Sequence, residues 1–351
     1  MRPTVRSSPH LVAGRGFAVL VVALAVALVG MTAFAIGVGT VDVPVGRVAA
    51  VVWGHLRGGT AGLDPLTDQI VWEFRTPRVL LAALAGGGLS LAGVCLQTLV
   101  RNPLADPYLF GVSAGASLGA VIAMTSGIGL VAGLGVAGAA FAGSLISLTV
   151  VFVMAQRGGR LIGSSLVLAG VAVAYLGTAV TSYLQLQANP AELRGVMFWM
   201  LGSVAGGSWD DLGVLTAATA VTAIWLSTQG RSMNALSVGD DTAAGLGVDV
   251  HRLRVLLLVA ASLLTAAVVS VAGGIGFVGL IVPHAVRLVV GPDHRKVIPV
   301  SVLAGAVFLV LVDLVTRTVD RPNEMPIGIF TAALGAPFFL VLLRKRKRAL
   351  R

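Results

Sequence analysis

The sequence predicts an all-α polytopic membrane protein with about ten transmembrane helices. Hydrophobic residues make up 56% of the 351 residues and charged residues only 11%, and the mean hydropathy is +0.94. Soluble globular chains carry about 25% charged residues. The apolar residues also gather in long runs separated by short polar turns, as bilayer-spanning helices require. No stretch has the composition of a separate soluble domain or of a low-complexity linker.

The N-terminal segment predicts a short cytoplasmic tail followed by a first span. Residues 1–15 carry three arginines, and an apolar run from Gly16 to Gly39 follows. This arrangement imitates a signal peptide. However, the run exceeds the roughly 7 to 15 apolar residues of a signal sequence and further spans follow, so we expect a retained helix. Residues 40–78 are mixed and polar and predict the first external loop.

A membrane hairpin is predicted over Arg75–Gly119. Its first arm, Val79–Val100, is uncharged and close to the roughly 20 residues that cross a bilayer core. The turn RNPLADP leads to a second arm that starts near Leu109. Small residues on one face of this arm would let two backbones approach closely, or would simply fill a tight bundle. The glycines that recur there every four residues are Gly111, Gly115 and Gly119.

The later apolar runs predict spans four to ten. They cover Leu130–Ala155, Leu161–Leu186, Leu212–Thr228, Val255–Ala272, residues 273–291, Val297–Thr316 and Ile327–Leu343. The eighth span is short and contains Pro283, which removes a backbone donor and should kink the helix. The mixed stretch Gln187–Asp211 predicts a short external helix with tryptophans at the membrane interface. A basic tail, residues 345–351, ends the chain.

The distribution of basic residues predicts the orientation. Eighteen of the 25 lysines and arginines fall in the predicted inner segments, as the positive-inside rule requires of cytoplasmic loops. This bias favours ten spans with both termini in the cytoplasm, and it explains the net charge of +10 better than nucleic-acid binding does. The outer basic residues are Arg47, Arg57, Arg75, Arg78, Arg194, Arg317 and Arg321.

Of the 15 acidic residues, only Asp313 falls inside a predicted span. Asp313 lies one helical turn before Arg317, so the two can neutralise each other, either as a structural ion pair or with Arg317 in a functional role. His284 follows Pro283 and suits packing better than a proton relay. The single cysteine, Cys95, excludes an intrachain disulfide and a cysteine-based metal cluster, and we expect no cofactor in this chain.

The sequence lacks the residues that would drive transport by itself. No series of acidic or histidine residues crosses the spans to carry coupling protons, and the motif HExxH is absent. None of the three lysines follows a glycine as the Walker A motif requires, so the chain cannot hydrolyse ATP alone. Active transport would therefore need another subunit, which could press on the inner segment 234–254. Helix starts and stops in this segment predict two short helices outside the membrane.

Five ordered motifs resemble the FecCD-type permease subunits of ABC importers for ferric siderophores, haem and cobalamin. They are RTPR, the run GxxLxxAGxxxQxxxRNPLADPxxxGVSAGAxLGA, GDDTAAGLGV, GxIGFVGLIVPHxxR and EMPIGIFTAALGAPFFLxLL, and together they cover most of residues 16–344. The resemblance implies the type II ABC importer architecture. Two ten-helix permease subunits would surround a central path, with two ATP-binding subunits beneath them and an extracytoplasmic substrate-binding protein above.

The resemblance also implies sites. The short helices after span six would receive the ATPase motion through Gly239, Asp240, Ala243, Leu246 and Gly247. The cytoplasmic turn nearby would include Arg101, Asn102 and Pro103. Carboxylates of the binding protein would meet arginines on the outer face, here Arg75, Arg78 and Arg317. All three arginines also belong to the outer basic set derived from charge distribution alone.

The expected function is transport of a ferric siderophore across the bacterial cytoplasmic membrane, with ATP hydrolysed by the partner subunits. Haem or cobalamin is the alternative cargo. A secondary transporter that works without an ATPase is the alternative from another class. Span five and the short helix after it would line and gate the path. The second permease subunit would be another copy of this chain or a related one, and the surrounding partner is membrane lipid.

Overall fold

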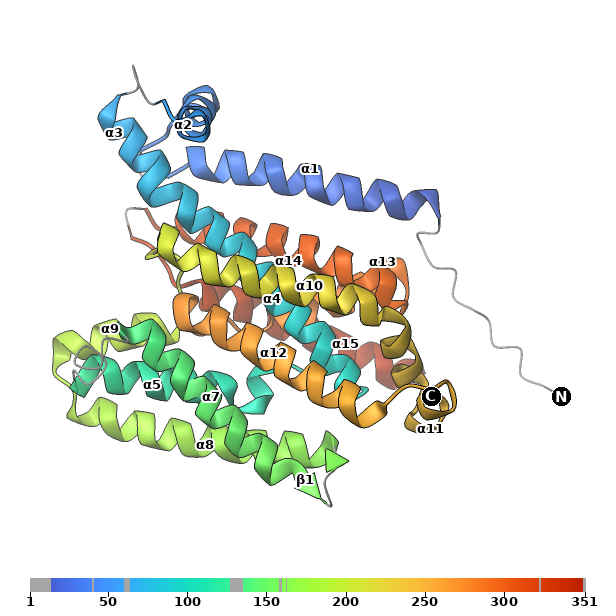
Figure 1. Cartoon of the computed structure of the whole chain (residues 1–351). Coiled ribbons are helices and arrows are strands. Elements are labelled where there is room, and N and C mark those ends of the chain that lie inside the picture. Colours follow the sequence, from blue (N-terminus) through green and yellow to red (C-terminus); the bar gives the residue numbers. More distant parts are fainter. Residues whose placement is uncertain are drawn as a thin grey trace.

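The computed structural model describes residues 14–39, 41–59, 64–126, 135–157, 160–161, 163–321 and 323–349. Long helices run side by side along one direction (Figure 1). Helices α2, α3 and α9 lie at one end of this bundle, and α11 lies at the other with the start of α1. Following the charge distribution, we name these the outer end and the inner end.

The described helices follow the predicted order. They are α1 (Arg15–Gly37), α2 (Val45–Arg57), α3 (Pro65–Asp68), the π-helix η1 (Gln69–Arg75), α4 (Thr76–Leu99), the 3-10 helix η2 (Pro107–Phe110), α5 (Val112–Ser126), α7 (Gly135–Ala155), α8 (Gly163–Gln187), α9 (Pro190–Met200), α10 (Trp209–Val238), α11 (Asp240–Gly245), α12 (Val250–Ala272), α13 (Val278–Val290), α14 (His294–Thr316) and α15 (Ile327–Ala349). Two-residue strands, β1 (Gln156–Arg157) and β2 (Arg160–Leu161), pair between α7 and α8.

Each predicted span corresponds to a helix of the bundle. Seven helices in the described part of the chain are long and apolar enough to cross a membrane. Three shorter apolar helices, Val112–Ser126, Val278–Val290 and Ile327–Val341, occupy the third, eighth and tenth predicted spans. The all-helical membrane fold is therefore confirmed, and the count of ten spans stays a prediction.

Helix α4 forms the centre of the bundle. It packs against α10, α12, α13 and α14, and most of its residues are buried. Glycines make this position possible because a β-carbon on Gly86 would overlap the carbonyl oxygen of Gly305, and one on Gly93 would overlap that of Gly279. Without side chains at these contacts the backbones of α4, α13 and α14 touch directly.

The glycine repeat after the RNPLADP turn packs α5 against α7, as predicted. A β-carbon on Gly115 would overlap the carbonyl oxygen of Gly143, and one on Gly119 would overlap that of Ala139. Gly111 has another role, because it ends η2 in a left-handed conformation with φ of 73°. Its carbonyl oxygen accepts a hydrogen bond of 2.7 Å from the Ser147 hydroxyl.

Most of the stretch 40–78, which was predicted to be the first external loop, is helical. Helix α2 ends at Gly58, which has φ of 73°. Helix α3 starts at Asp64, whose carboxylate accepts a hydrogen bond of 3.1 Å from the Thr67 amide. Because α3, η1 and α4 continue into one another, one helical rod runs from Pro65 to Leu99.

The inner segment also differs from the prediction. Helix α10 continues past the expected end at Thr228 to Val238, because the first residue that interrupts it is Gly239. One short helix then follows, α11, in place of the two expected. Gly247, with φ of 81°, turns the chain after α11 towards α12.

Candidate functional sites at the two ends of the bundle

The three predicted docking arginines come together at the outer end. Arg75 closes η1, Arg78 lies in the first turn of α4, and Arg317 follows the last residue of α14. Arg75 and Arg78 lie three residues apart on one continuous rod, so they share a face. All three side chains are buried within this chain. Sequence reasoning placed them on the outer side but identified only one of their partners, Asp313 for Arg317.

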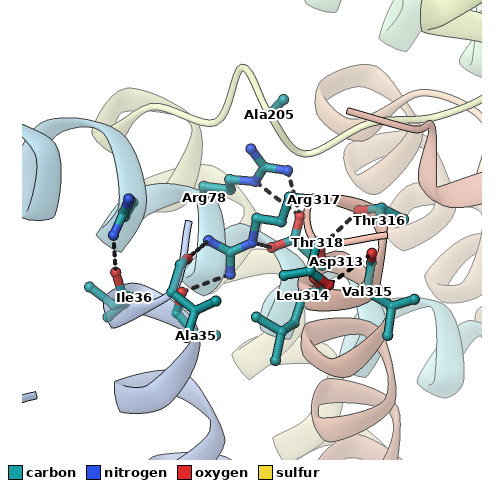
Figure 2. Close-up of polar contacts among 12 residues, drawn as sticks. Ala35, Ile36, Arg78, Ala205, Asp313, Leu314, Val315, Thr316, Arg317 and Thr318 are labelled. Atoms are coloured by element: carbon teal, nitrogen blue, oxygen red, sulfur yellow. Dashed lines mark hydrogen bonds and ion pairs between the residues drawn. The ribbon is translucent and has the colours of Figure 1, made fainter. Parts of the chain in front are cut away.

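Two of the arginines cap the end of α1. Arg75 donates hydrogen bonds to the carbonyl oxygens of Ile36 at 3.1 Å and Gly37 at 3.0 Å. Arg317 donates to the carbonyl oxygen of Ala35 at 2.8 Å (Figure 2). The last four carbonyls of a helix have no partner inside the helix, and they carry the negative end of its dipole. The guanidinium groups therefore satisfy and stabilise this helix end.

Two carboxylates compensate the arginine charges. Asp313 is 0% exposed and lies 2.9 Å from Nη2 of Arg78 and 3.2 Å from Nε of Arg317. Figure 2 shows its carboxylate between the two guanidinium groups. Both oxygens of Glu324 accept from Nη1 of Arg78 at 2.9 Å. The predicted Asp313–Arg317 ion pair is therefore confirmed, and Arg78 is an additional partner that sequence reasoning missed.

A cavity of about 230 Å³ opens beside this cluster. Its charged lining comes from Arg75, Arg78, Arg317 and Glu324. With Asp313, the described residues of the cluster hold three cations and two carboxylates, so the site carries an excess positive charge. The Glu324 side chain is 42% exposed whereas Asp313 is not exposed at all. Glu324 is therefore the more accessible of the two carboxylates.

At the inner end, Asp240 joins three segments of the chain. Its carboxylate lies 2.9 Å from Nη2 of Arg254 at the start of α12. It also lies 3.5 Å from Nη1 of Arg101 in the RNPLADP turn. The turn and α11 are thus neighbours, as the family resemblance led us to expect. Asp240 is the first residue of α11, so its negative charge also interacts favourably with the positive end of that helix dipole.

The residues of α11 and its flanks divide into supporting and exposed positions. Ala243 is buried, and Gly239 and Gly247 bound the short helix. Leu246 is 70% exposed.

The RNPLADP turn is fixed by its own side chains. Arg101 adopts a left-handed conformation with φ of 51°, and the Asn102 side chain accepts from the Leu104 amide at 3.1 Å. Pro103 follows in the turn. Asp106 is buried, and its carboxylate accepts hydrogen bonds from the amides of Tyr108, at 2.8 Å, and Phe277. Burial raises the pKa of Asp106 to about 6.

A second polar cavity lies beside the predicted path. It measures about 240 Å³ and is lined by residues of η2, α5, α8 and α9, including Tyr108, Ser113, Thr178 and Thr181. The hydroxyl groups of Tyr108 and Thr181 are buried. Helix α9 confirms the short helix predicted between spans five and six. His284, the other polar candidate, packs against the edge of Phe338 with ring centroids 6.2 Å apart.

A membrane-embedded helical bundle with a short charged helix at one end and an arginine cluster at the other defines a transport subunit. The chain belongs to the FecCD transport family, which it matches over residues 24–345. It is thus an ABC importer permease. The fold agrees with a solved structure of a metal-chelate type ABC transporter in an inward-facing conformation. The TM-score is 0.81 at 31% identity, covering 93% of this chain and 99% of the other.

Curated relatives carry names that concern cargo. The chain is 48% identical over 286 residues to the cobalamin import system permease protein BtuC of Halobacterium salinarum, covering 82% of this chain and 76% of the relative. It is 41% identical over 278 residues to the vitamin B12 import system permease protein BtuC of Vibrio cholerae, covering 79% and 83%.

Proposed function

We propose that this chain is the translocating subunit of a binding-protein-dependent importer in the bacterial cytoplasmic membrane. It pairs with a second permease chain and draws energy from two ATP-binding subunits. The observation that carries this proposal is the inner end, where Asp240 joins α11 to the RNPLADP turn and to α12, and Leu246 is exposed beside it. Since the chain has no Walker A motif, ATP-driven transport requires a surface that binds a separate ATPase subunit.

At the outer end, the binding protein docks by exchanging carboxylates. A glutamate or aspartate of the partner enters the cavity beside Arg75, Arg78 and Arg317 and takes the place of Glu324 on Arg78. Asp313 stays in place because it is fully buried between two guanidinium groups. Charge pairs of this kind contribute to encounter rate and orientation, so docking weakens as salt rises.

The cargo we propose is cobalamin. A ferric siderophore was the cargo expected first from the sequence, but two relatives are named for cobalamin or vitamin B12 import. A ferric siderophore and haem are the competing cargoes. The hydroxyl-lined cavity between α5, α8 and α9 supports a path along α8, where the resemblance places the gate.

The test is reconstitution. The chain is co-expressed with the ATPase encoded beside it, and the purified complex is placed in nanodiscs and in liposomes. ATP hydrolysis and cargo uptake are then measured while the neighbouring binding protein is added with cobalamin, a ferric siderophore or haem. We expect ATP hydrolysis and uptake to rise with cobalamin-loaded binding protein alone.

Stimulation by the siderophore or by haem instead would replace the cargo assignment and leave the importer intact. If no ATPase co-purifies with the chain, the partner assignment at the inner end is wrong. Glu324→Gln tests the outer end, because it frees Arg78 and should tighten docking. Arg78→Gln should weaken docking, and surface binding measurements at two salt concentrations separate these outcomes.

A further inference from the structure

We propose that Asn234, His294 and Thr98 form a hydrogen-bonded link that carries the movement of α11 into the centre of the bundle. The three are positioning residues for transport, and the inference rests on the proposed function, in which α11 receives the ATPase stroke. Asn234 lies on α10, His294 opens α14 and Thr98 is in the last turn of α4. The link therefore joins three helices that are remote in sequence.

Asn234 is held in one orientation by bonds on both sides of its amide. Its oxygen accepts from the backbone N–H of His294 at 2.9 Å and lies 2.8 Å from the ring Nδ1. Its nitrogen donates to the Asp293 carboxylate at 2.7 Å. A flipped amide would set donor against donor and oxygen against carboxylate, so these contacts exclude it. The end of α10 cannot slide past α14 without breaking all of them.

His294 passes the connection on to α4. Because its Nδ1 faces an amide oxygen, that nitrogen must carry a proton. The other ring nitrogen, Nε2, lies 2.7 Å from the hydroxyl of Thr98. His294 and Thr98 are both buried, so water does not compete for these bonds.

Gln97, the residue before Thr98 on α4, extends the link to α13. The Gln97 amide donates to the carbonyl oxygens of Gly279 at 3.0 Å and Leu280 at 3.2 Å. Its oxygen accepts from Arg287. A shift at the end of α10 is thus passed to α14, α4 and α13, the helices whose backbones touch at the centre of the bundle.

The position of Asn234 explains why the link serves movement as well as stability. It lies five residues before Gly239, where α10 ends, and α11 begins directly after this break and packs against α10, so a displacement of α11 acts on the end of α10 that carries Asn234. On the previous turn Gly230 has no room for a β-carbon, which would contact the Arg295 side chain at 2.8 Å. The same stretch of α10 is therefore fitted to the start of α14 at two points.

The experiment compares ATP hydrolysis with cargo uptake in the reconstituted complex. Asn234→Leu and Thr98→Val remove the bonds while keeping the side-chain volume. Thr98→Ser keeps the hydroxyl. Ser227→Ala is the matched control, because Ser227 lies on the same helix outside the segment 234–254 and its hydroxyl donates to the carbonyl oxygen of Ala223 one turn back. We expect the number of ATP hydrolysed per cargo imported to rise about 5-fold or more in Asn234→Leu and Thr98→Val.

Thr98→Ser and Ser227→Ala should keep the wild-type ratio, and the double variant Asn234→Leu/Thr98→Val should be no worse than either single one. An unchanged ratio in Asn234→Leu overturns the link. So does a parallel loss of hydrolysis, uptake and melting temperature, since that marks a purely structural role. If the wild-type complex itself imports no cargo, the proposed function has failed instead.

Discussion

Among single residues, Asp313 has the largest expected effect on the outer end. It is fully buried and contacts two guanidinium groups, while a third arginine lies nearby in the same cluster. Burying an ion costs several kcal/mol unless a partner compensates it. Asp313 therefore decides whether Arg78 and Arg317 can remain inside the bundle.

Asp313→Asn should lower the stability of the protein by about 3–5 kcal/mol, because it leaves buried cations without their carboxylate. Glu324→Gln is the matched control, and it should cost at most about 1 kcal/mol, since Glu324 is 42% exposed. Thermal unfolding of the purified protein in detergent measures both changes. Equal losses in the two variants would contradict the assignment of Asp313 as the compensating charge.

Asp106 gives a prediction about pH. Its pKa is raised to about 6 by burial, so the folded state binds its proton more tightly than the unfolded state does. The protonated Asp106 carboxyl contributes favourably to the stability of the folded state below about pH 4, and this contribution is lost as the pH rises to about 6. Asp106→Asn should therefore melt higher than the wild type at pH 7.5, by an amount that corresponds to up to about 3 kcal/mol.

This advantage should vanish near pH 4. Asp293→Asn provides the opposite sign, because hydrogen bonding to Arg295 lowers the pKa of Asp293 to about 2. That variant should melt below the wild type at pH 7.5, and the difference should shrink as the pH falls towards 2. If the difference in melting temperature between Asp106→Asn and the wild type did not change with pH, it would contradict the raised pKa of Asp106.

At the scale of helices, direct backbone contact between α4 and α13 holds the centre together. Gly93→Ala should destabilise the protein strongly, because the new β-carbon overlaps the Gly279 carbonyl and neither backbone can yield. Gly213→Ala on α10 meets nothing within 4 Å. This control should be neutral or stabilise by up to about 1 kcal/mol through helix propensity. Thermal unfolding of both variants tests the contact, and similar melting temperatures would argue against it.

The helices that sequence reasoning missed share a physical cause. Hydropathy detects runs long enough to cross a bilayer, whereas α2 is short and shows its buried side only through Val48 and Val51. The charges of Glu73, Arg75 and Arg78 suggested a loop, yet they lie on the rod that continues into α4. Tertiary partners make those charges tolerable inside a helix, and no local pattern reports such partners.

For the whole molecule, the distribution of lysine and arginine predicts that α11 faces the cytoplasm and α2 the outside. Leu246→Cys and Trp53→Cys place thiols at exposed positions on the two ends. A membrane-impermeant maleimide should label Leu246→Cys only in inside-out vesicles and Trp53→Cys only in spheroplasts. The unsubstituted chain is the control, since Cys95 is buried and should stay unlabelled in both. The reverse pattern would invert the topology.

The sequence predicted the molecule better than it predicted its sites. Runs of apolar residues located the helices, and the motifs located Arg75, Arg78, Arg317 and Asp240. Most of the bonding partners of these residues were not predicted. Arg78 and Asp313 are 235 positions apart, and Asn234 and His294 are 60 apart. Such pairs depend on how the helices pack, which one sequence does not encode locally.

The capping of α1 has a consequence for the order in which the chain is assembled. Chains are made from the N-terminus, so α1 enters the membrane first. Arg75, which caps it from 38 and 39 residues away, follows soon after, whereas Arg317 is 282 residues from the Ala35 carbonyl. The Arg75 cap of α1 is therefore available early in synthesis, and the Arg317 cap only after α14 has been made. The hydrogen bond from Arg317 to Ala35 joins the last part of the chain to its first helix, so it can form only when synthesis is nearly complete.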